Sequence, residues 1–481
     1  MLFRQTLGYL PAQLLGPLAQ LVSIIAWTHL ANEHVIGVVT FVTVTQDLLA
    51  QVGLIWWTGY LFRFFRAQGQ DQSKLLASSF LVVGLGVVIQ GVLAIANVLV
   101  FVDPTADAVL CAAIFAFVAL RGINSYNLTL ASIREQPLDY SVYALCGPLG
   151  GFLLGVTGLW LFGPSPLWPV LGYAIGEGAA VAYGLFRSRH ETLSFTGAGA
   201  PILAGFVFGF PIALSSAFEW LVLNLPRYAV DSVMGIDAVG QYAVGFGLGQ
   251  RATSLAAMAV TVAAYPLAIR RSEESGHGAG MAQVAENVAL LVGVMAPSLV
   301  GLWLVSGPLV RMAIGETYWQ STLALMPWSL LAGGLTALTL HFLHHVILLE
   351  KRTWTLVGAE LATVLITFAC VLPALRAFGM VGAVIAIVAG RGLVGAPLLG
   401  WFMLRRGLVL PWRSLAYVAI ATVAMAAVVL AIPEEDTWQR LGLHIAAGAT
   451  TYALFIAIFY RNWISERLRN TLARAGRENA A

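Results

Sequence analysis

The sequence predicts an all-α integral membrane protein, and three observations support this fold class. Of the 481 residues, 59% are hydrophobic and only 10% are charged, and the mean hydropathy is +0.83. A soluble domain of this length could not bury so much apolar surface in its core. Apolar stretches long enough for a membrane-spanning helix, which needs roughly 20 residues, recur along the whole chain. The sequence does not show the alternating segments of about ten residues that are typical of membrane β-barrels.

Polar clusters, prolines and glycines divide the chain into fourteen predicted spans. The first span follows Arg4 and lacks the short apolar core and cleavage site of a secretion signal, so we interpret it as a transmembrane helix. The next five spans end at the stretches "RAQGQDQSK", "DPT", "REQP", "GPSP" and "RSRHETLS". The following seven end at "DSVMGID", "RRSEESGHG", "IGETY", "EKR", "RAFG", "RRG" and "PEEDT", and the last ends before the basic tail. In chain order the spans are 6–29, 35–64, 75–102, 106–132, 138–163, 167–187, 199–226, 238–268, 284–309, 319–348, 353–374, 379–404, 412–432 and 438–461.

Lysine and arginine residues predict the orientation of these spans. With this division, 19 of the 26 basic residues lie on one side of the membrane, 4 lie on the other and the rest lie within spans. Because basic residues favour the cytoplasmic side, we expect an even number of spans and two cytoplasmic termini. The basic tail 462–481 would rest on anionic lipid headgroups.

An internal repeat predicts two lobes of six helices each. Four short segments in the first half correspond, in the same order, to segments about 200 to 214 residues later. The pairs are "GYLPAQ" with "FGFPIA", "ANEHVIGVV" with "GIDAVGQYA", "TQDLLAQ" with "GQRATSL", and "IGEGAAV" with "AGRGLVG". We therefore predict a first lobe at 1–195, a second lobe at 196–408 and two additional helices at 409–461. Parallel repeats of this kind place a substrate site between the halves of a transporter.

The stretch 207–268 carries residues typical of a known family. Its family-like features are Gly209 and Pro211, then Arg227, the turn "VGQYA" at 239–243, and Tyr265-Pro266. This pattern resembles the seventh and eighth helices of bacterial polysaccharide flippases, which belong to the superfamily of multidrug, oligosaccharidyl-lipid and polysaccharide exporters. Weaker counterparts are "LANEHVIGVVTF" and "SGPLVRMAIGETY", so the resemblance covers at least residues 1–405. The family commonly has an acidic residue before the arginine, where this chain has Pro226.

The resemblance implies a V-shaped helical bundle that moves an oligosaccharide on undecaprenyl diphosphate from the cytoplasmic to the periplasmic leaflet of the bacterial inner membrane. The oligosaccharide would be a repeat unit of O-antigen (lipopolysaccharide), capsule or exopolysaccharide. The polymerase and glycosyltransferases of that pathway would be partners, together with membrane lipids. A lipid II flippase and a cation-coupled multidrug exporter of the same superfamily are the alternatives. A membrane polysaccharide polymerase or ligase is disfavoured because the predicted exterior loops are short.

Ionisable residues within the spans predict the site, because each costs about 2.5–3.5 kcal/mol to insert and usually faces a bundle interior or a wet cavity. The repeat places Asp47 at the position equivalent to Arg251, and Glu177 at the position equivalent to Arg391. We therefore predict that an acidic wall of the first lobe faces a basic wall of the second. Arg121, Arg251 and Arg391 are candidates for binding the diphosphate, since a guanidinium donates paired hydrogen bonds to phosphate oxygens. Asp47 and Glu177 would hold these arginines in ion pairs or accept a coupling proton.

The remaining candidate residues are not paired by the repeat. The resemblance adds Arg227 to the phosphate-binding set, and Glu219 is a third candidate for coupling or ion pairing. Static ion pairs that fix helix packing are the alternative for every charged candidate. Trp56, Trp57 and Tyr60 would stack on sugars at the cavity mouth, or anchor the second span at the membrane interface. The sequence contains no nucleotide-binding GxxxxGK[ST], catalytic triad or metal-ligand cluster. We therefore expect no enzymatic activity, cofactor, metal or nucleic-acid partner, and a proton or sodium ion as the coupling ion.

Overall fold

The protein is an all-α, multi-pass membrane protein. A computed structural model describes residues 2–66, 71–350 and 352–461, and within these ranges the chain forms helices and connections without strands. The predicted all-α class is thereby confirmed. The predicted basic tail at 462–481 lies outside the described residues.

The helices follow the predicted spans closely. In the first half they are α1 (Leu2–Leu30), α2 (Glu33–Gly53), α3 (Ile55–Phe64), α4 (Gln72–Asn97), α5 (Ala108–Ile133), α6 (Pro137–Phe162) and α7 (Leu167–Ser188). Then come α8 (Gly199–Met234), α9 (Ile236–Ser275), α10 (His277–Leu304), α11 (Ser306–Ala313), α12 (Trp319–Leu338) and α13 (His344–Leu349). The last are α14 (Thr353–Phe378), α15 (Met380–Arg406), α16 (Trp412–Ala431) and α17 (Trp438–Phe459).

Eleven helical segments of the described chain are long and apolar enough to cross a membrane. Each of the fourteen predicted spans coincides with a helix or a run of helices, but α1, α7 and α9 are not among those eleven. In α7 the charged Glu177 and several glycines lower the mean hydropathy of the segment. The count of fourteen spans therefore stays a prediction.

Side-chain caps explain where several helices begin. Asn32 accepts a hydrogen bond from the backbone N–H of Val35 at the start of α2. Asp71 caps α4 in the same way, and Asp107 caps α5. Such caps satisfy N–H groups that have no partner within the helix. The polar residues that separate the spans in the sequence thus also fix the ends of the helices.

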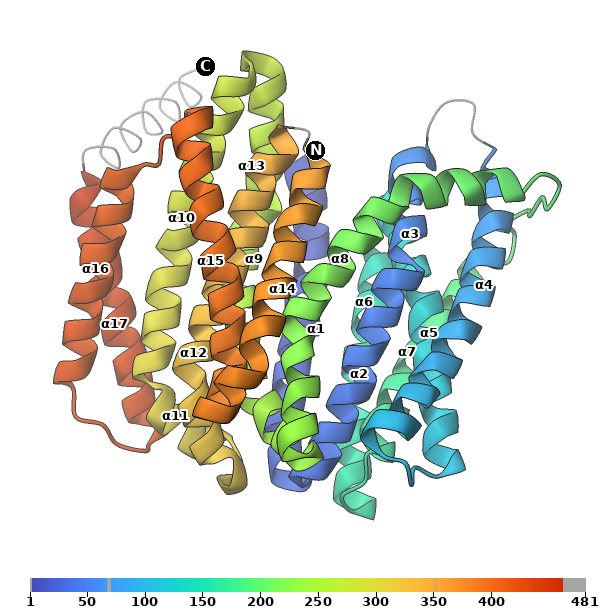
Figure 1. Cartoon of the computed structure of the whole chain (residues 1–481), viewed down its shortest axis with the longest axis horizontal. Helices are drawn as coiled ribbons and strands as arrows, with labels where there is room; N and C mark the ends of the chain where they lie inside the picture. The colour runs from blue at the N-terminus through green and yellow to red at the C-terminus, as the bar shows by residue number, and fades with distance from the viewer. Residues whose placement is uncertain (1, 67–70, 351, 462–481) are drawn as a thin grey trace, which may run out of the picture. The chain divides into compact units, whose positions relative to one another are not determined.

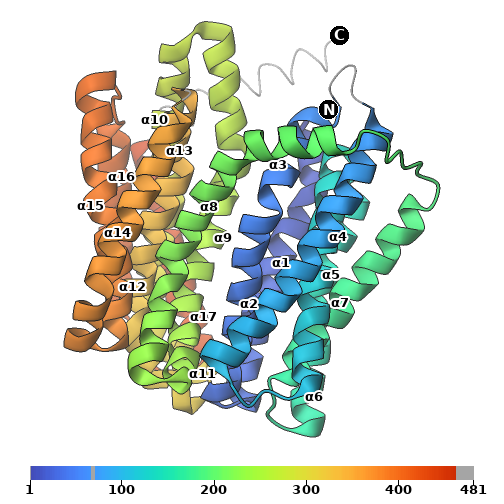
Figure 2. The same ribbon diagram turned by 45° about the vertical axis from the view of Figure 1, so that its right-hand side comes forward.

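The chain forms two compact units. The first contains Met1–Arg251, Ile314–Ala332 and Lys351–Val394, and the second contains Ala252–Ala313, Gly333–Glu350 and Gly395–Ala481. Within the first unit, α6 packs along α1 and α7, while α8 packs along α2, α3 and α14 (Figures 1 and 2). Within the second unit, α16 packs against α17 and α10. Because α8 lies against α2 and α3, it belongs to the first unit, which therefore extends past residue 195. The division into two six-helix lobes stays a prediction.

Glycines allow α6 and α7 to approach closely. A Cβ atom added to Gly176 on α7 would clash with the carbonyl oxygen of Cys146, and one added to Gly150 on α6 would lie 2.5 Å from that of Gly172. Small residues at such positions let two membrane helices pack backbone to backbone. The glycine that precedes Glu177 is therefore part of a helix–helix contact.

Candidate functional site

A polar cavity of about 320 Å³ lies within the first unit, and α1, α2, α5, α7, α8 and α9 contribute to its wall. Its charged residues come from α2, α5, α8 and α9, one from each helix. They are Asp47, Arg121, Arg227 and Arg251. Amide side chains lie between them, namely Gln20, Gln46, Gln51, Asn224 and Gln250. So many polar groups within membrane helices make this cavity the candidate functional site, since each costs free energy unless it has a partner.

Arg121 is held in this cavity by a buried acid. Its Nη1 donates a hydrogen bond of 2.7 Å to Oε1 of Glu177, whose side chain is 0% exposed, whereas that of Arg121 is 34% exposed. The other carboxylate oxygen accepts a hydrogen bond of 2.5 Å from Nδ2 of Asn124. A Cβ atom on Gly147 would clash with Oε1, so this glycine leaves the space that the carboxylate occupies. Glu177 therefore neutralises and orients Arg121 from behind the cavity wall.

The other two arginines use few of their donors on the protein. Nη1 of Arg251 donates to the backbone oxygen of Gln20 at 3.1 Å. Nη1 of Arg227 donates to Oδ1 of Asn224, and its Cζ lies 5.6 Å from the centroid of the Phe246 ring. Within the described residues, Nε of Arg227 has no hydrogen-bond partner. Since a guanidinium has five N–H donors, both side chains keep donors that are not engaged by the part of the chain that the structure describes.

Asp47 is exposed to the cavity on α2. It forms no ion pair shorter than 4.0 Å with any described residue, but its carboxylate interacts electrostatically with Arg121, Arg227 and Arg251. Because Glu177 neutralises Arg121, the two remaining arginines face a single carboxylate. The cavity therefore carries an excess of positive charge, which attracts an anion into a region of low dielectric.

Arg391 does not belong to this site, contrary to the prediction. Its Nη1 donates a hydrogen bond of 2.7 Å to Oε1 of Glu360 on α14, and the two side chains are 0% and 1% exposed. A Cβ atom on the neighbouring Gly390 would clash with Oγ1 of Thr367, so α15 lies close against α14 here. Glu177 and Arg391 correspond by repeat position but do not pair with each other, because each has its partner on a neighbouring helix. The geometry of Arg391 is that of the static ion pair named as the alternative. Glu219 lies half-buried on α8 and does not line the cavity.

Two of the three predicted sugar-stacking aromatics, Trp57 and Tyr60, are packed in the protein interior. Trp57 is 0% exposed, donates a hydrogen bond of 3.0 Å from Nε1 to Oγ of Ser79, and stacks on Tyr60. Tyr60 is 6% exposed, and Nε1 of Trp56 donates to the backbone oxygen of Gly53. Close packing of α3 on α8 covers the ring faces of Trp57 and Tyr60, so neither sugar stacking nor an interfacial belt describes them. Trp56 borders a separate apolar pocket.

The aromatic residues that do line the cavity were missed in the sequence. Tyr173 lies between Trp27 and Phe117, with ring centroids 6.1 and 5.5 Å away, and all three line the cavity. Aromatic residues within apolar spans look like ordinary core or lipid-facing positions. The amides offered a clearer signal, since Gln20 and Gln250 lie within predicted spans, where a polar side chain needs a partner.

Comparisons with known proteins agree on the fold. The family model for polysaccharide biosynthesis proteins matches residues 35–323. A structure titled "Lipid II flippase MurJ, inward closed conformation" superposes with a TM-score of 0.75 at 13% identity and covers 95% of this chain and 99% of that one. An inward-facing multidrug transporter of the MATE family has a TM-score of 0.56 at 16% identity, covering 81% and 94%. An outward-facing transporter of the same family has a TM-score of 0.57 at 13% identity, covering 84% and 94%. No curated protein sequence matches the chain.

Proposed function

The chain belongs to the family of polysaccharide biosynthesis proteins and has the fold of lipid and drug transporters, and from this premise we propose that it flips an oligosaccharide linked to undecaprenyl diphosphate. The family that the sequence resembles is confirmed, and the transporter fold agrees with the prediction that the protein is not an enzyme. Transport would run from the cytoplasmic to the periplasmic leaflet of the bacterial inner membrane, with both termini in the cytoplasm. The cargo would be a repeat unit of a surface polysaccharide.

The observation that carries this proposal is the cluster of guanidinium groups around one cavity. Arg121, Arg227 and Arg251 come from three helices and line the same space. Arg227 and Arg251 keep donors that no described residue accepts. A planar guanidinium binds phosphate oxygens through paired hydrogen bonds, which makes a diphosphate a fitting ligand. An organic cation, the typical cargo of a multidrug exporter, would be repelled by the same groups.

Neutral groups in the cavity suit a sugar. Gln20, Gln46 and Gln250 offer amide donors and acceptors, and Thr40 and Thr43 offer hydroxyl groups. The volume of about 320 Å³ is at the lower end of the range of ligand pockets, about 300–1,000 Å³. We infer that the diphosphate and its first sugar occupy the cavity, while the rest of the oligosaccharide extends beyond it.

The two acids would have separate roles. Glu177 keeps Arg121 oriented at every stage, because its carboxylate is fully buried and bonded to Arg121 and Asn124. Asp47 faces the cavity directly and would repel an arriving diphosphate. Protonation of Asp47 would remove this repulsion and so couple binding to a proton. A sodium ion bound at Asp47 is the alternative coupling ion.

A binding experiment tests the proposal. Purified full-length protein is titrated with undecaprenyl diphosphate and, separately, with undecaprenyl monophosphate. We expect tighter binding of the diphosphate, and a loss of about 10- to 100-fold in Arg251→Gln, since a hydrogen bond to a charged group contributes about 1.5–3 kcal/mol. Arg311→Gln is the matched control, because Arg311 pairs with Asp436 outside the cavity. Equal binding by wild type and Arg251→Gln would contradict the proposal.

Cell experiments separate the three transport candidates. After deletion of the gene, lipid-linked oligosaccharides should accumulate in the cytoplasmic leaflet and surface polysaccharide should decrease. Rescue of a strain depleted of its lipid II flippase would instead favour lipid II as the cargo. Efflux of a cationic dye such as a rhodamine, without any effect on polysaccharide, would favour a multidrug exporter.

A further inference from the structure

A second pocket of about 590 Å³ shares no residue with the polar cavity. It lies within the first unit, and its walls come from α4, α5, α6, α7 and the connection from α7 to α8. Its lining is largely apolar and includes Leu76, Val83, Ile123, Leu130 and Val181, together with the polar side chains of Ser79, Tyr126, Asn127 and Tyr143. The function proposed above makes no use of this pocket.

The pocket opens toward the lipid. Phe80 on α4 is 64% exposed and Leu185 on α7 is 67% exposed, and both line the pocket. Exposed apolar side chains on membrane-spanning helices face hydrocarbon, so an occupant can enter from the bilayer. Gly84 on α4 also lines the pocket, and a Cβ atom added there would meet no atom within 4 Å. The volume and the apolar part of the lining suit an acyl chain, since each buried methylene contributes about 0.8 kcal/mol.

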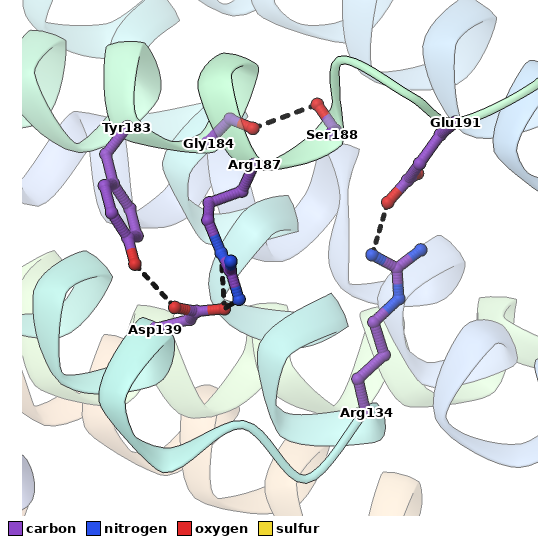
Figure 3. Close-up of polar contacts among 7 residues, drawn as sticks. All are labelled: Arg134, Asp139, Tyr183, Gly184, Arg187, Ser188 and Glu191. Atoms are coloured by element: carbon purple, nitrogen blue, oxygen red, sulfur yellow. Dashed lines mark hydrogen bonds and ion pairs between the residues drawn. The ribbon is translucent and has the colours of Figure 1, made fainter.

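One end of the pocket carries two cations and two anions (Figure 3). Arg134, which follows the last turn of α5, donates a hydrogen bond of 2.5 Å from Nη1 to Oε1 of Glu191. Arg187 in the last turn of α7 donates from Nε and Nη2 to Oδ2 of Asp139, at 3.1 and 2.9 Å. Asp139 also accepts a hydrogen bond of 2.6 Å from the hydroxyl of Tyr183. Both cations lie at helix C-termini, where the helix dipole favours positive charge.

The connection from α7 to α8 fixes this end in place. The backbone N–H of Ser194 donates to the oxygen of Ser73 at 3.2 Å, and Oγ of Ser78 donates to the oxygen of Ala198 at 2.7 Å. The ring of Phe195 lies edge-on to that of Phe80, with centroids 6.2 Å apart. Glu191, which belongs to the same connection, is thereby held over the polar end of the pocket. By the distribution of basic residues, this end faces the cytoplasm.

Two of the four charged groups have hydrogen-bonding capacity that no other described residue uses. Arg187 is 49% exposed, and its Nη1 is not engaged by Asp139. Glu191 is 25% exposed, and its Oε2 is not engaged by Arg134. A free cationic donor and a free anionic acceptor at one rim match a headgroup that carries both charges. A purely anionic headgroup would meet Asp139 and Glu191 without any excess of positive charge to compensate.

We propose that this pocket binds a zwitterionic phospholipid of the cytoplasmic leaflet, such as phosphatidylethanolamine. One acyl chain lies between α4 and α7, the phosphate accepts hydrogen bonds from Arg187, and the ammonium donates to Glu191. Arg134 and Asp139 are positioning residues, because they orient the two headgroup partners. This site is independent of the cargo of the polar cavity.

Native mass spectrometry of the purified full-length protein tests the site. The protein is incubated with phosphatidylethanolamine, phosphatidylglycerol or cardiolipin at equal concentrations, and bound lipids are counted. We expect wild type to retain one phosphatidylethanolamine more strongly than the two anionic lipids. Gly84→Leu should lose that lipid, because its side chain fills the pocket. Gly358→Leu is the matched control, since a Cβ atom at Gly358 on α14 also meets nothing within 4 Å.

Charge variants test the headgroup assignment. Glu191→Gln leaves the rim with one excess cation, so preference should shift about fivefold from phosphatidylethanolamine toward phosphatidylglycerol, as expected for a single partly exposed ion pair. Arg187→Gln should weaken retention of both lipids. The thermal midpoint of each variant in lipid-free detergent shows whether it is folded. Equal retention in folded Gly84→Leu and wild type would overturn the site. The headgroup assignment would be overturned if wild type retained all three lipids equally. It would also be overturned if undecaprenyl diphosphate bound at this rim more tightly than phosphatidylethanolamine.

Discussion

Glu177 and Arg121 form an ion pair of 2.7 Å in which the carboxylate is fully buried and the guanidinium reaches the polar cavity. The pair joins α5 and α7, so it connects a residue of the cavity wall to the interior of the bundle. The Glu177 carboxylate is therefore enclosed by protein, whereas the Arg121 guanidinium borders the cavity. This asymmetry makes the pair open to a direct test.

We predict that the double-mutant cycle of Arg121→Gln and Glu177→Gln yields a coupling free energy of about 1–3 kcal/mol. The value should lie below that of a fully buried pair, because Arg121 is 34% exposed. Chemical unfolding of the purified protein in detergent measures the free energy of unfolding of each variant. Additive effects of the two substitutions would show that the contact contributes nothing.

Gly147→Ala should impair ligand binding through Glu177. The added methyl group would clash with Oε1 of Glu177, so the carboxylate must move and Arg121 loses its partner. We expect weaker binding of undecaprenyl diphosphate and a lower thermal midpoint. Gly358→Ala, at an open helical position, is the control and should change neither quantity. Unaltered binding by Gly147→Ala would contradict the positioning role of Glu177.

Arg391 and Glu360 should determine stability and not binding. Removing one partner of a buried ion pair typically costs about 3–5 kcal/mol, whereas replacing both by apolar residues is often neutral or stabilising. We therefore expect Arg391→Met to lower the free energy of unfolding by that amount, and the double variant Arg391→Met/Glu360→Met to recover most of the loss. Undecaprenyl diphosphate binding should stay at the wild-type level in the double variant. A loss of binding in the double variant would show that Arg391 takes part in ligand binding.

Trp57→Ala should destabilise the protein by about 3–5 kcal/mol, the usual cost of truncating a buried aromatic residue. Trp57 is 0% exposed and donates a hydrogen bond to Ser79. Trp57→Phe should cost less, since it removes mainly the indole N–H. Neither substitution should change the affinity for the lipid diphosphate once the folded fraction is taken into account. A selective loss of affinity would support the sugar-stacking role that the packing of Trp57 opposes.

The sequence predicted the helices well because their ends depend on local chemistry. Asn32, Asp71 and Asp107 interrupt apolar runs and also cap the helices that follow. The break at Leu54 between α2 and α3 was not predicted. Gly53 directly precedes it, but a single glycine inside a helical pattern is tolerated and does not by itself mark a helix end.

The partners of the charged residues were harder to predict. The sequence shows that Glu177 needs a counter-charge within the membrane, but Arg121, Arg251 and Arg391 all fit that requirement. The repeat made Arg391 the positional counterpart of Glu177 and left their contact open, whereas the packing of α5 on α7 makes Arg121 the partner, 56 residues away in the chain. Such a choice depends on which helices become neighbours. Single-sequence patterns do not contain that information.

The exposed carboxylate of Asp47 has a kinetic consequence for a carrier. Without it, the guanidinium groups of Arg227 and Arg251 would retain a diphosphate so strongly that its dissociation would limit every cycle. Asp47 interacts electrostatically with both arginines, so under the proposed function it would weaken the net attraction and shorten the residence time of the cargo. A transport protein requires this compromise, since its cargo must leave as readily as it enters.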